Sequence, residues 1–223
     1  MVHFLNGFFL YVCECVSDMK NITLRVCSYN IHKGFSAGNT KFLLEDIRHA
    51  IRLVNADLVF LQEVVGHNAR HSDSVPDWVS ETQFEFMADA VWPHHAYGKN
   101  AVYDHGHHGN AILSRFPILN WDNYDLSLMP FSHRGVLHAK ILNKLHIFCV
   151  HCGLLSIERK SQLKKLVEII RARAGDGDPV IVAGDFNDWR NKAGPLLQEE
   201  LGLSEVLSEV YGKPRATFPA FLP

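Results

Sequence analysis

Several apolar segments of this sequence end in a polar residue that could bind a metal ion or a phosphate. They end at Asn30, Glu63, His151 and Asp185, and Asn187 follows two residues after the last of these. In α/β folds, the loops that follow strand ends bring their side chains into one place. Carboxylate and amide oxygens are ligands that hard cations prefer, and they also suit chemistry at a phosphoryl group. Together, these residues could form one site for metal-assisted phosphate chemistry.

Taken singly, each of these residues has an ordinary structural explanation. A carboxylate at the mouth of a buried strand, as at Glu63, is costly unless it is paired, and a helix cap or salt bridge would satisfy it. Asn30, and the acid and amide that follow Gly184, are typical of turns. Arg134 could bind a phosphate through two parallel hydrogen bonds, but a lone arginine is more often a surface residue. Only the combination points to a site.

The histidines and cysteines offer a second kind of chemistry, metal binding through nitrogen and sulfur. Five of the 14 histidines lie close together in the sequence: His94, His95, His105, His107 and His108. They lack the matching cysteine or carboxylate spacing of a zinc site, which disfavours a zinc protein. Cys149 and Cys152 have C-x-x-C spacing, but on a strand they face opposite sides, which disfavours a redox centre. The sequence contains no P-loop, dinucleotide fingerprint, nucleophile elbow or zinc-protease helix.

The elements that would position these residues alternate between strands and helices. We expect strands at residues 24–30, 58–61, 111–113, 135–142, 145–151 and 180–183, and helices at about 43–54, 84–91 and 156–174. Asn39 or Thr40 is a plausible N-cap for the first helix, and the basic residues of the last helix, Arg159 among them, predict a solvated face. Consecutive strands without helices between residues 111 and 151 indicate antiparallel pairing.

Length and composition set the limits of the interpretation. The 223 residues suffice for one domain, and the 47% hydrophobic content excludes a disordered chain or a coiled coil. The formal net charge of −2 gives no global positive field for nucleic acid, so any such binding needs local groups. Five cysteines, an odd number, indicate a reducing compartment, and we expect a cytoplasmic protein. No run approaches the roughly 18 apolar residues of a membrane helix, so no transmembrane segment is expected.

The N-terminal residues differ from the rest of the chain. Residues 4–16 are apolar but short, contain Glu14 and lack the basic start of a signal peptide. Met19 stands directly before the first well-defined strand. We therefore expect residues 1–18 to be an extension outside the core and residues 19–223 to form the domain.

Six short motifs, taken in order, resemble the endonuclease/exonuclease/phosphatase superfamily. They are Tyr29-Asn30-Ile31-His32, Leu61-Gln62-Glu63-Val64, Gly109-Asn110-Ala111-Ile112-Leu113-Ser114-Arg115, Arg134-Gly135, Val150-His151 and Gly184-Asp185-Phe186-Asn187. The resemblance runs from about residue 22 to the last residue and is greatest to the small bacterial members. It implies an α/β fold, a four-layer α/β/β/α sandwich of two mixed, largely antiparallel sheets, with the site at one end.

The resemblance also implies a role for each matched residue. Three groups result: the metal ligands Glu63 and Asn30; the catalytic residues Asp185, Asn187 and His151; and the phosphate-binding residues Arg134, His32 and Asn110. The metal would be Mg²⁺, with Mn²⁺ as the alternative. The substrate would be a phosphate ester, with DNA or another phosphodiester among the candidates, and we expect a monomer.

The end of the sequence departs from the family pattern. Members end with an Asp on a late strand and then a Ser-Asp-His triplet, whereas no His follows Asn187 here. We therefore expect a C-terminally truncated domain that lacks its last strands. Two functions follow: a Mg²⁺-dependent phosphoesterase that cleaves phosphodiesters or phosphomonoesters by in-line attack of water, or an inactive remnant that keeps a metal and phosphate half-site. A His/Cys metal-binding protein is a third, less favoured interpretation.

Overall fold

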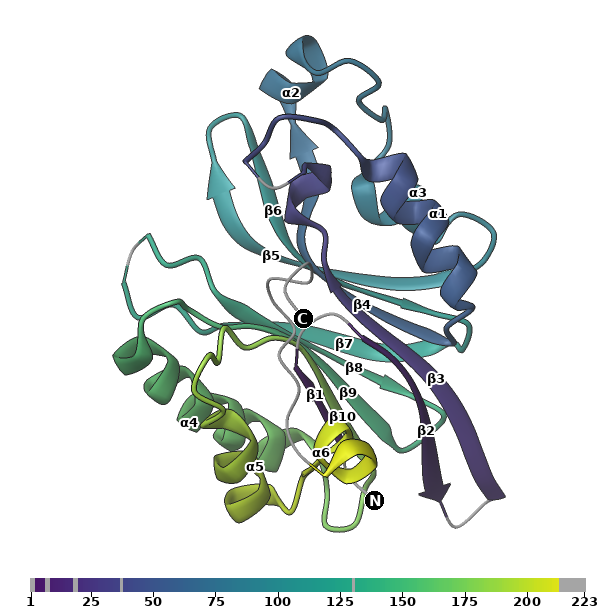
Figure 1. The fold of residues 1–223 in the computed structure, drawn as a ribbon, viewed down its shortest axis with the longest axis vertical. Coiled ribbons are helices and arrows are strands. Elements are labelled where there is room, and N and C mark those ends of the chain that lie inside the picture. The colour runs from purple at the N-terminus through teal and green to yellow at the C-terminus, as the bar shows by residue number, and fades with distance from the viewer. Residues whose placement is uncertain (1–2, 7–8, 18–19, 37, 130, 213–223) are drawn as a thin grey trace.

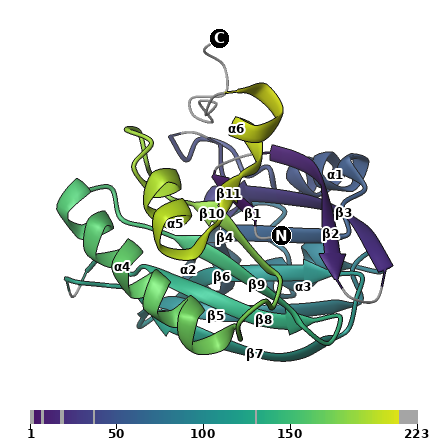
Figure 2. The ribbon, with the colours of Figure 1, turned by 90° about the horizontal axis from the view of Figure 1, so that it is seen from below.

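Two β-sheets lie face to face in the structure, a computed structural model, and helices cover the outer face of each sheet (Figure 1). The structure describes residues 3–6, 9–17, 20–36, 38–129 and 131–212. The view from below shows α4 and α5 lying over one sheet (Figure 2). Within the described part of the chain, no helix is long and apolar enough to cross a membrane.

The first sheet has five strands and carries the first two motifs. In spatial order its strands are β2 (Phe9–Ser17), β3 (Lys20–Asn30), β4 (Leu58–Asn68), β6 (Gly106–Ser114) and β5 (His94–Tyr103). Only β3 and β4 run parallel, which brings Asn30 opposite Gln62. The other neighbours are antiparallel.

The second sheet has six strands and carries the later motifs. In spatial order they are β11 (Ser204–Glu205), β1 (His3–Asn6), β10 (Val180–Asp185), β9 (Leu145–His151), β8 (Gly135–Ile141) and β7 (Ile118–Asp125). Strands β9 and β10 are parallel, while β7, β8 and β9 pair antiparallel. The predicted mixed α/β sandwich is therefore confirmed.

Three separate apolar cores hold the four layers together. One lies between the sheets and contains Phe60 and Ile147. The second lies between the six-stranded sheet and the helices α4 (Ser156–Arg173) and α5 (Ala193–Leu201). The third lies between the five-stranded sheet and α1 (Leu44–Val54) and α3 (Gln83–Ala88). The remaining helices are short: η1 (His32–Gly34), α2 (Ala69–Ser74) and α6 (Val206–Tyr211).

Helix α1 begins later than its expected cap. The N-cap position is Leu43, which makes no side-chain hydrogen bond. The predicted caps, Asn39 and Thr40, instead belong to a turn in which the Ser36 hydroxyl contacts Thr40 and accepts the Lys41 amide. The prediction was wrong because these polar residues satisfy a local turn before the helix starts.

The N-terminal segment pairs with both sheets. Four residues of β1 pair with β10, and nine residues of β2 pair with β3. This differs from the expectation that residues 1–18 lie outside the sandwich, because their backbone hydrogen bonds extend each sheet. Sequence periodicity alone does not show whether such a segment pairs with a sheet or lies outside the domain.

Removal of the N-terminal segment should therefore destabilise the domain. A chain that starts at Met19 leaves the edges of β3 and β10 unpaired, and each lost hydrogen bond contributes about 0.5–1.5 kcal/mol. We expect a loss of about 2 kcal/mol or more, which corresponds to a fall in thermal midpoint of about 4–8 °C. Differential scanning calorimetry measures this midpoint. An unchanged midpoint would show that residues 1–18 are an extension, as the sequence alone predicts.

Candidate functional site

The strand register brings the candidate residues to one end of the sandwich. In the six-stranded sheet, His151 at the end of β9 lies opposite both Gly135 on β8 and Asp185 on β10. Arg134 precedes Gly135, so three neighbouring strands supply Arg134, His151 and Asp185. In the five-stranded sheet, parallel pairing of β3 with β4 places Asn30 beside Gln62, next to Glu63.

A single amide group joins the two carboxylates of the site. Asn30 Nδ2 donates to Glu63 Oε1 at 3.3 Å and to Asp185 Oδ2 at 3.1 Å. His151 Nε2 lies 4.0 Å from an oxygen of each carboxylate. Asn30 Oδ1 accepts the backbone N–H of His32 at 3.0 Å, which fixes which way the amide points. Four of the predicted residues, two from each sheet, thus meet within hydrogen-bond or ion-pair distance.

Several of these residues adopt a left-handed backbone conformation. The φ angles of Glu63, Asn187, His32 and Lys33 are 55°, 49°, 48° and 59°. The register of β4 with β6 shifts between Leu61 and Val64, so Glu63 lies in a β-bulge. Bulges redirect side chains, and non-glycine residues at positive φ cost of order 1–3 kcal/mol each. Such strain collects where side-chain placement matters more than stability.

Glycine is required next to Asp185. Gly184 has a φ of 151°, and a Cβ built there would lie 2.0 Å from the carbonyl oxygen of Val150. The glycine therefore allows β10 to pass close to β9 just before its functional end. This close approach sets Asp185 beside His151.

Glu63 is held ionised by its neighbours. Burial alone would raise its pKa, but the charge of His151 in its protonated form, the charge of Lys33 and the hydrogen bonds from Lys33 and Asn30 lower the pKa to about 2. Lys33 Nζ lies 3.1 Å from Glu63 Oε2, and His32 Nδ1 lies 3.8 Å from the same oxygen. Sequence reasoning missed Lys33, although it lies inside the motif that contains Asn30 and His32.

A buried glutamine supports both Lys33 and the strand that carries Glu63. Gln83 Nε2 donates to the carbonyl of Lys33 at 2.8 Å, and its Oε1 accepts the amide of Val65 at 2.8 Å. Gln83 is 1% exposed and lies in the first turn of α3. The helix thereby fixes the loop that bears Lys33 against β4.

Two histidines of the site are kept neutral. Burial and the charge of Arg134 lower the pKa of His151, although Asp185 and Glu63 act in the opposite direction. Burial and Lys33 lower the pKa of His108 to about 4. Both imidazoles are therefore uncharged near neutral pH, and each can accept or donate a hydrogen bond depending on its tautomer.

Asn187 and Arg134 each keep a donor for a ligand. Asn187 Nδ2 donates one N–H to the Cys152 carbonyl at 2.9 Å, and its backbone N–H donates to Asp185 Oδ1 at 3.0 Å. The second N–H of the Asn187 amide is not needed for that bond. Arg134 Nε is buried and makes no hydrogen bond with any residue that the structure describes. An anion is the natural partner for such donors.

Asn110 does not offer its amide hydrogens to a phosphate. Its Nδ2 donates to the carbonyls of Gly135 at 3.0 Å and Cys149 at 3.2 Å. Its buried Oδ1 makes no hydrogen bond within the described part of the chain, but an oxygen cannot donate to an anion. Asn110 therefore joins the two sheets behind the site, which differs from the predicted phosphate contact. His32 lies at the edge of the site, where its Nε2 contacts Asn39 Oδ1 at 3.0 Å.

A buried polar network underlies the loops that follow the site residues. Glu158, Arg159, Gln162 and Asp188 are all buried. Gln162 bonds to the Leu126 carbonyl, the Gly153 amide and Glu158, and Glu158 accepts the Ser132 hydroxyl. Arg159 donates to the carbonyls of Gly153 and Leu154, and its Nε lies 3.9 Å from Asp188.

This network corrects the prediction for Arg159. The helical pattern placed it on a solvated face, yet its side chain is buried because the preceding loop folds over the start of α4. The network ties together the chain segments that carry Arg134, His151 and Asn187. Nothing in the helical periodicity of residues 156–174 indicates this role.

The described cysteines and histidines outside the site are not grouped as a metal centre. Cys149 lies in the core between the sheets, whereas Cys152 lies in the core under α4, so they face opposite sides as predicted. Both are free, buried thiols, and burial raises the pKa of Cys149 to about 12. Among the described residues, no group of three or more His, Cys, Asp or Glu side chains is arranged to hold a metal ion.

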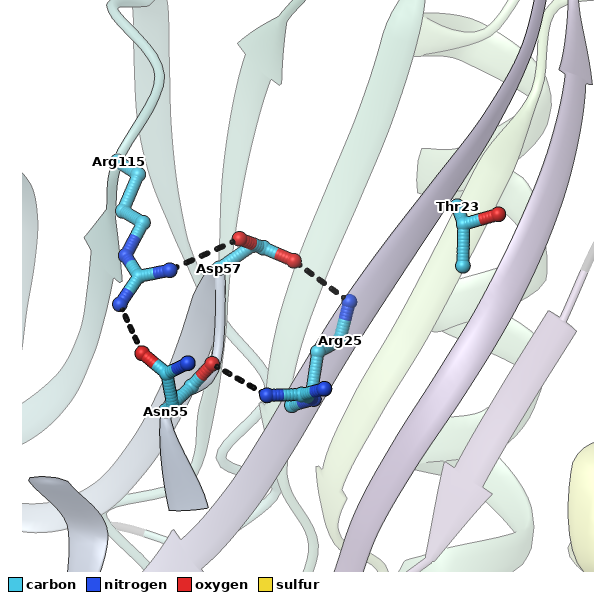
Figure 3. A pocket seen from close by; sticks show the side chains of 5 residues that line it. All are labelled: Thr23, Arg25, Asn55, Asp57 and Arg115. Atoms are coloured by element: carbon cyan, nitrogen blue, oxygen red, sulfur yellow. Dashed lines mark hydrogen bonds and ion pairs between the residues drawn. The ribbon is translucent and has the colours of Figure 1, made fainter. Parts of the chain in front are cut away.

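A polar pocket lies at the end of the five-stranded sheet opposite to the candidate site. Its volume is about 260 Å³, and Figure 3 shows its lining residues: Thr23, Arg25, Asn55, Asp57 and Arg115. Asp57 accepts from the Arg25 amide at 2.8 Å and from Arg115 Nη1 at 3.2 Å, while Arg115 Nη2 contacts the Asn55 side chain. Arg25 Nη1 donates to the Asn55 carbonyl at 3.3 Å, so both guanidinium groups join the α1–β4 turn to its neighbouring strands, which is a structural role.

Comparison with known proteins assigns the family. A sequence model of the Endonuclease/Exonuclease/phosphatase family matches residues 27–222, so the chain belongs to this family. The enzymes of this family are phosphoesterases, nucleases among them. The uncharacterized protein YbhP of Escherichia coli K12 is 44% identical over 209 residues, which cover 92% of this chain and 82% of YbhP.

Solved structures support the same fold. An endonuclease/exonuclease/phosphatase from Beutenbergia cavernae superimposes with a TM-score of 0.57 at 19% identity, covering 74% of this chain and 47% of its own. This chain thus spans about half the length of that protein. Humanized D. rerio TDP2 gives a TM-score of 0.56 at 20% identity, covering 84% of this chain and 72% of its own. The predicted family resemblance is therefore confirmed.

The ionised state of Glu63 predicts a particular pH dependence of stability. Its folded pKa of about 2 lies below the ordinary value of 4.5, so its contribution is present above pH 4.5 and is lost as pH falls toward 2. Between pH 7 and pH 4, the free energy of unfolding should fall by roughly 1 kcal/mol more in the wild type than in Glu63→Gln. Urea unfolding at both pH values measures the difference. Glu168→Gln, on the exposed face of α4, is the control and should keep the wild-type pH dependence; the same slope in Glu63→Gln would contradict the assignment.

Proposed function

We propose that the protein hydrolyses phosphate esters at the end of the sandwich where Asn30, Glu63, His151 and Asp185 meet. The observation that carries the proposal is the pair of carboxylates bridged by one amide at 3.1 and 3.3 Å, in a site that also contains the buried Arg134 Nε, a donor with no partner among the described residues. Carboxylates that cluster in this way at strand ends are typical of a site built for a ligand. Membership in the phosphoesterase family supports the same reaction class.

The donors of the site would bind the phosphoryl group. Arg134 Nε and the second N–H of the Asn187 amide are available to its oxygens, and their strand ends fix them in place. His151 lies 4.0 Å from each carboxylate and is neutral, so it can donate a hydrogen bond without repelling Arg134. Such fixed donors stabilise the charge that develops on a phosphoryl group during transfer.

Asp185 would orient the attacking water. Its Oδ1 accepts the Asn187 amide and its Oδ2 accepts Asn30, so the carboxylate cannot rotate freely. Each oxygen retains a lone pair that can accept a proton or a hydrogen bond from water. We propose attack in line with the leaving oxygen, with a phosphodiester favoured over a phosphomonoester as substrate.

The carboxylate oxygens of the site fit a hard divalent cation. Glu63 is ionised, and the Lys33 ammonium already pairs with its Oε2, where a cation is therefore tolerated. Glu63 and Asp185 would hold Mg²⁺ or Mn²⁺, which when bound polarises the phosphoryl oxygen and stabilises the leaving oxygen. The orientation of Asn30 does not suit the metal-ligand role predicted for it, because its oxygen accepts the His32 amide and its nitrogen faces the carboxylates. Asn30 would instead hold the two carboxylates together.

The thiols bear on the compartment of the protein. Cys27, Cys149 and Cys152 are free and buried, which suits a reducing, cytoplasmic environment. We propose that the protein acts there as a monomer.

Hydrolysis of bis(p-nitrophenyl) phosphate with and without Mg²⁺ tests the function. We expect Mg²⁺-dependent turnover that falls at least about 100-fold in Glu63→Ala and in Asp185→Ala, because each removes a positioned charge. Glu168→Gln, an exposed carboxylate on α4, is the matched control and should keep full activity. Phosphate binding without turnover would favour an inactive protein that keeps only a binding site.

The buried network predicts a second class of activity-lowering variant. Arg159→Met should break the bonds to Gly153, Leu154 and Asp188 and loosen the segments that carry His151 and Asn187. Misplacement of about 1 Å can cost about 100-fold in rate. We expect kcat to fall while the variant remains folded, and Arg159→Lys to recover part of the loss. A fall that simply follows the thermal midpoint in both variants would show a structural role alone.

A further inference from the structure

Exposed apolar side chains gather on three segments next to the site. Among the described residues, ten large hydrophobic side chains are exposed, and six of them lie in these segments: Leu128, Phe131, Leu154, Leu155, Ile157 and Trp189. The segments, called the rim loops below, are residues 126–129 with 131–134, 152–160, and 186–192. Contiguous exposed apolar surface on a soluble domain marks an interaction site. The other four exposed hydrophobics lie on α1, β5 and β7.

Buried polar bonds join the rim loops to one another, so their exposed apolar side chains lie on neighbouring segments of the surface. Ser132 of the first loop bonds to Glu158 of the second, and Gln162 bonds to both Leu126 and Gly153. Arg159 faces Asp188 of the third loop at 3.9 Å. The end of β7 and the start of α4 lie on the same side of the molecule in Figure 1.

The charge of the rim loops is one-sided. Their two acidic residues, Glu158 and Asp188, are buried in the polar network. The charged side chains that the loops expose are Lys160, Arg190 and Lys192. Within the rim loops, the exposed apolar side chains are therefore accompanied by basic side chains only, although the chain as a whole has a net charge of −2. The exposed Asp125 directly precedes the first loop, where its carboxylate accepts the Ser127 amide. Apolar side chains flanked by Lys and Arg bind the interface of anionic lipids.

The rim loops are continuous with the proposed reaction site. The first ends at Arg134, the second follows His151 directly, and the third contains Asn187. A surface that bound these loops would hold its phosphate groups beside these residues. Four of the six exposed side chains are aliphatic, which favours acyl chains over nucleic-acid bases, because bases need aromatic faces for stacking.

From these observations we infer that the rim loops dock on an anionic phospholipid surface and that the site acts on a phosphate ester presented by that surface. The inference rests on the proposed function for the identity of the reacting group, while the docking itself is independent of turnover. The apolar tips of the rim loops would enter the headgroup region, and Lys160, Arg190 and Lys192 would face the lipid phosphates.

Vesicle co-sedimentation of the full chain tests the docking. The probes are vesicles of phosphatidylcholine alone and vesicles of phosphatidylcholine with phosphatidylglycerol. We expect binding to the anionic vesicles, weakened at high salt, and at least a 10-fold loss in Phe131→Ser/Ile157→Ser. The matched control, Leu53→Ser/Val102→Ser, removes two equally exposed side chains elsewhere; the exposed fractions are 73% and 82% in the first pair and 74% and 68% in the second.

The outcomes separate this inference from the proposed function. Absence of binding to anionic vesicles, or equal loss in both double variants, overturns the docking surface, whatever the activity. Turnover of soluble bis(p-nitrophenyl) phosphate should be the same in Phe131→Ser/Ile157→Ser as in the wild type. If the wild-type chain binds the anionic vesicles but does not turn over this substrate, the proposed function is wrong and the docking surface stands. Concentration-dependent dimers that the Phe131→Ser/Ile157→Ser variant abolishes, or tighter binding to single-stranded DNA than to vesicles, would assign the surface to another partner.

Discussion

The hydrogen bonds of the Asn30 amide join the two sheets at the point on which the site depends. Asn30 and Glu63 belong to the five-stranded sheet, and Asp185 and His151 belong to the six-stranded sheet. The Glu63 and Asp185 carboxylates repel each other, and the one amide that donates to both offsets part of that repulsion. Lys33 on one side and Arg134 on the other supply the remaining positive charge. The site therefore exists only when the two sheets are packed in register.

Polar contacts behind the site keep that register. Asn110 donates from the five-stranded sheet to the carbonyls of Gly135 and Cys149 in the other sheet. Gln62 donates to the Cys149 sulfur at 3.2 Å, and that thiol donates to the Leu61 carbonyl at 3.4 Å. Apolar packing between sheets tolerates small sliding, whereas buried hydrogen bonds allow one alignment, since a broken bond leaves an unsatisfied buried group. These residues explain why motifs from both sheets include buried polar positions.

The sequence allowed prediction of the strands that carry the site, because each is a short apolar run that ends in a polar residue. Strands β8, β9 and β10 were predicted to within one or two residues. Strands β5 and β7 escaped prediction, since they are edge strands with half-exposed polar faces and give no clear alternation. Lys33, Gln83 and Arg159 escaped for another reason. Their roles depend on long-range contacts, which local periodicity does not contain. The same holds for the bonds of Asn110, whose partners lie on the other sheet.

The same buried network connects the chemistry to the surface around it. Asp188 accepts the Ala193 backbone amide and faces Arg159, and Glu158 accepts from Ser132 and Gln162, so both acids are buried. These bonds fix the loop that precedes Arg134 and the loops that follow His151 and Asp185. Because the acids are buried, the exposed charge of these loops is positive. Because buried side chains of the network form hydrogen bonds with the loop backbone, the loop tips can be apolar. A loop without such support would need polar side chains at its tip to bond its own backbone. The network that supports Arg134, His151 and Asn187 thus also leaves apolar and basic side chains exposed on the loops beside them.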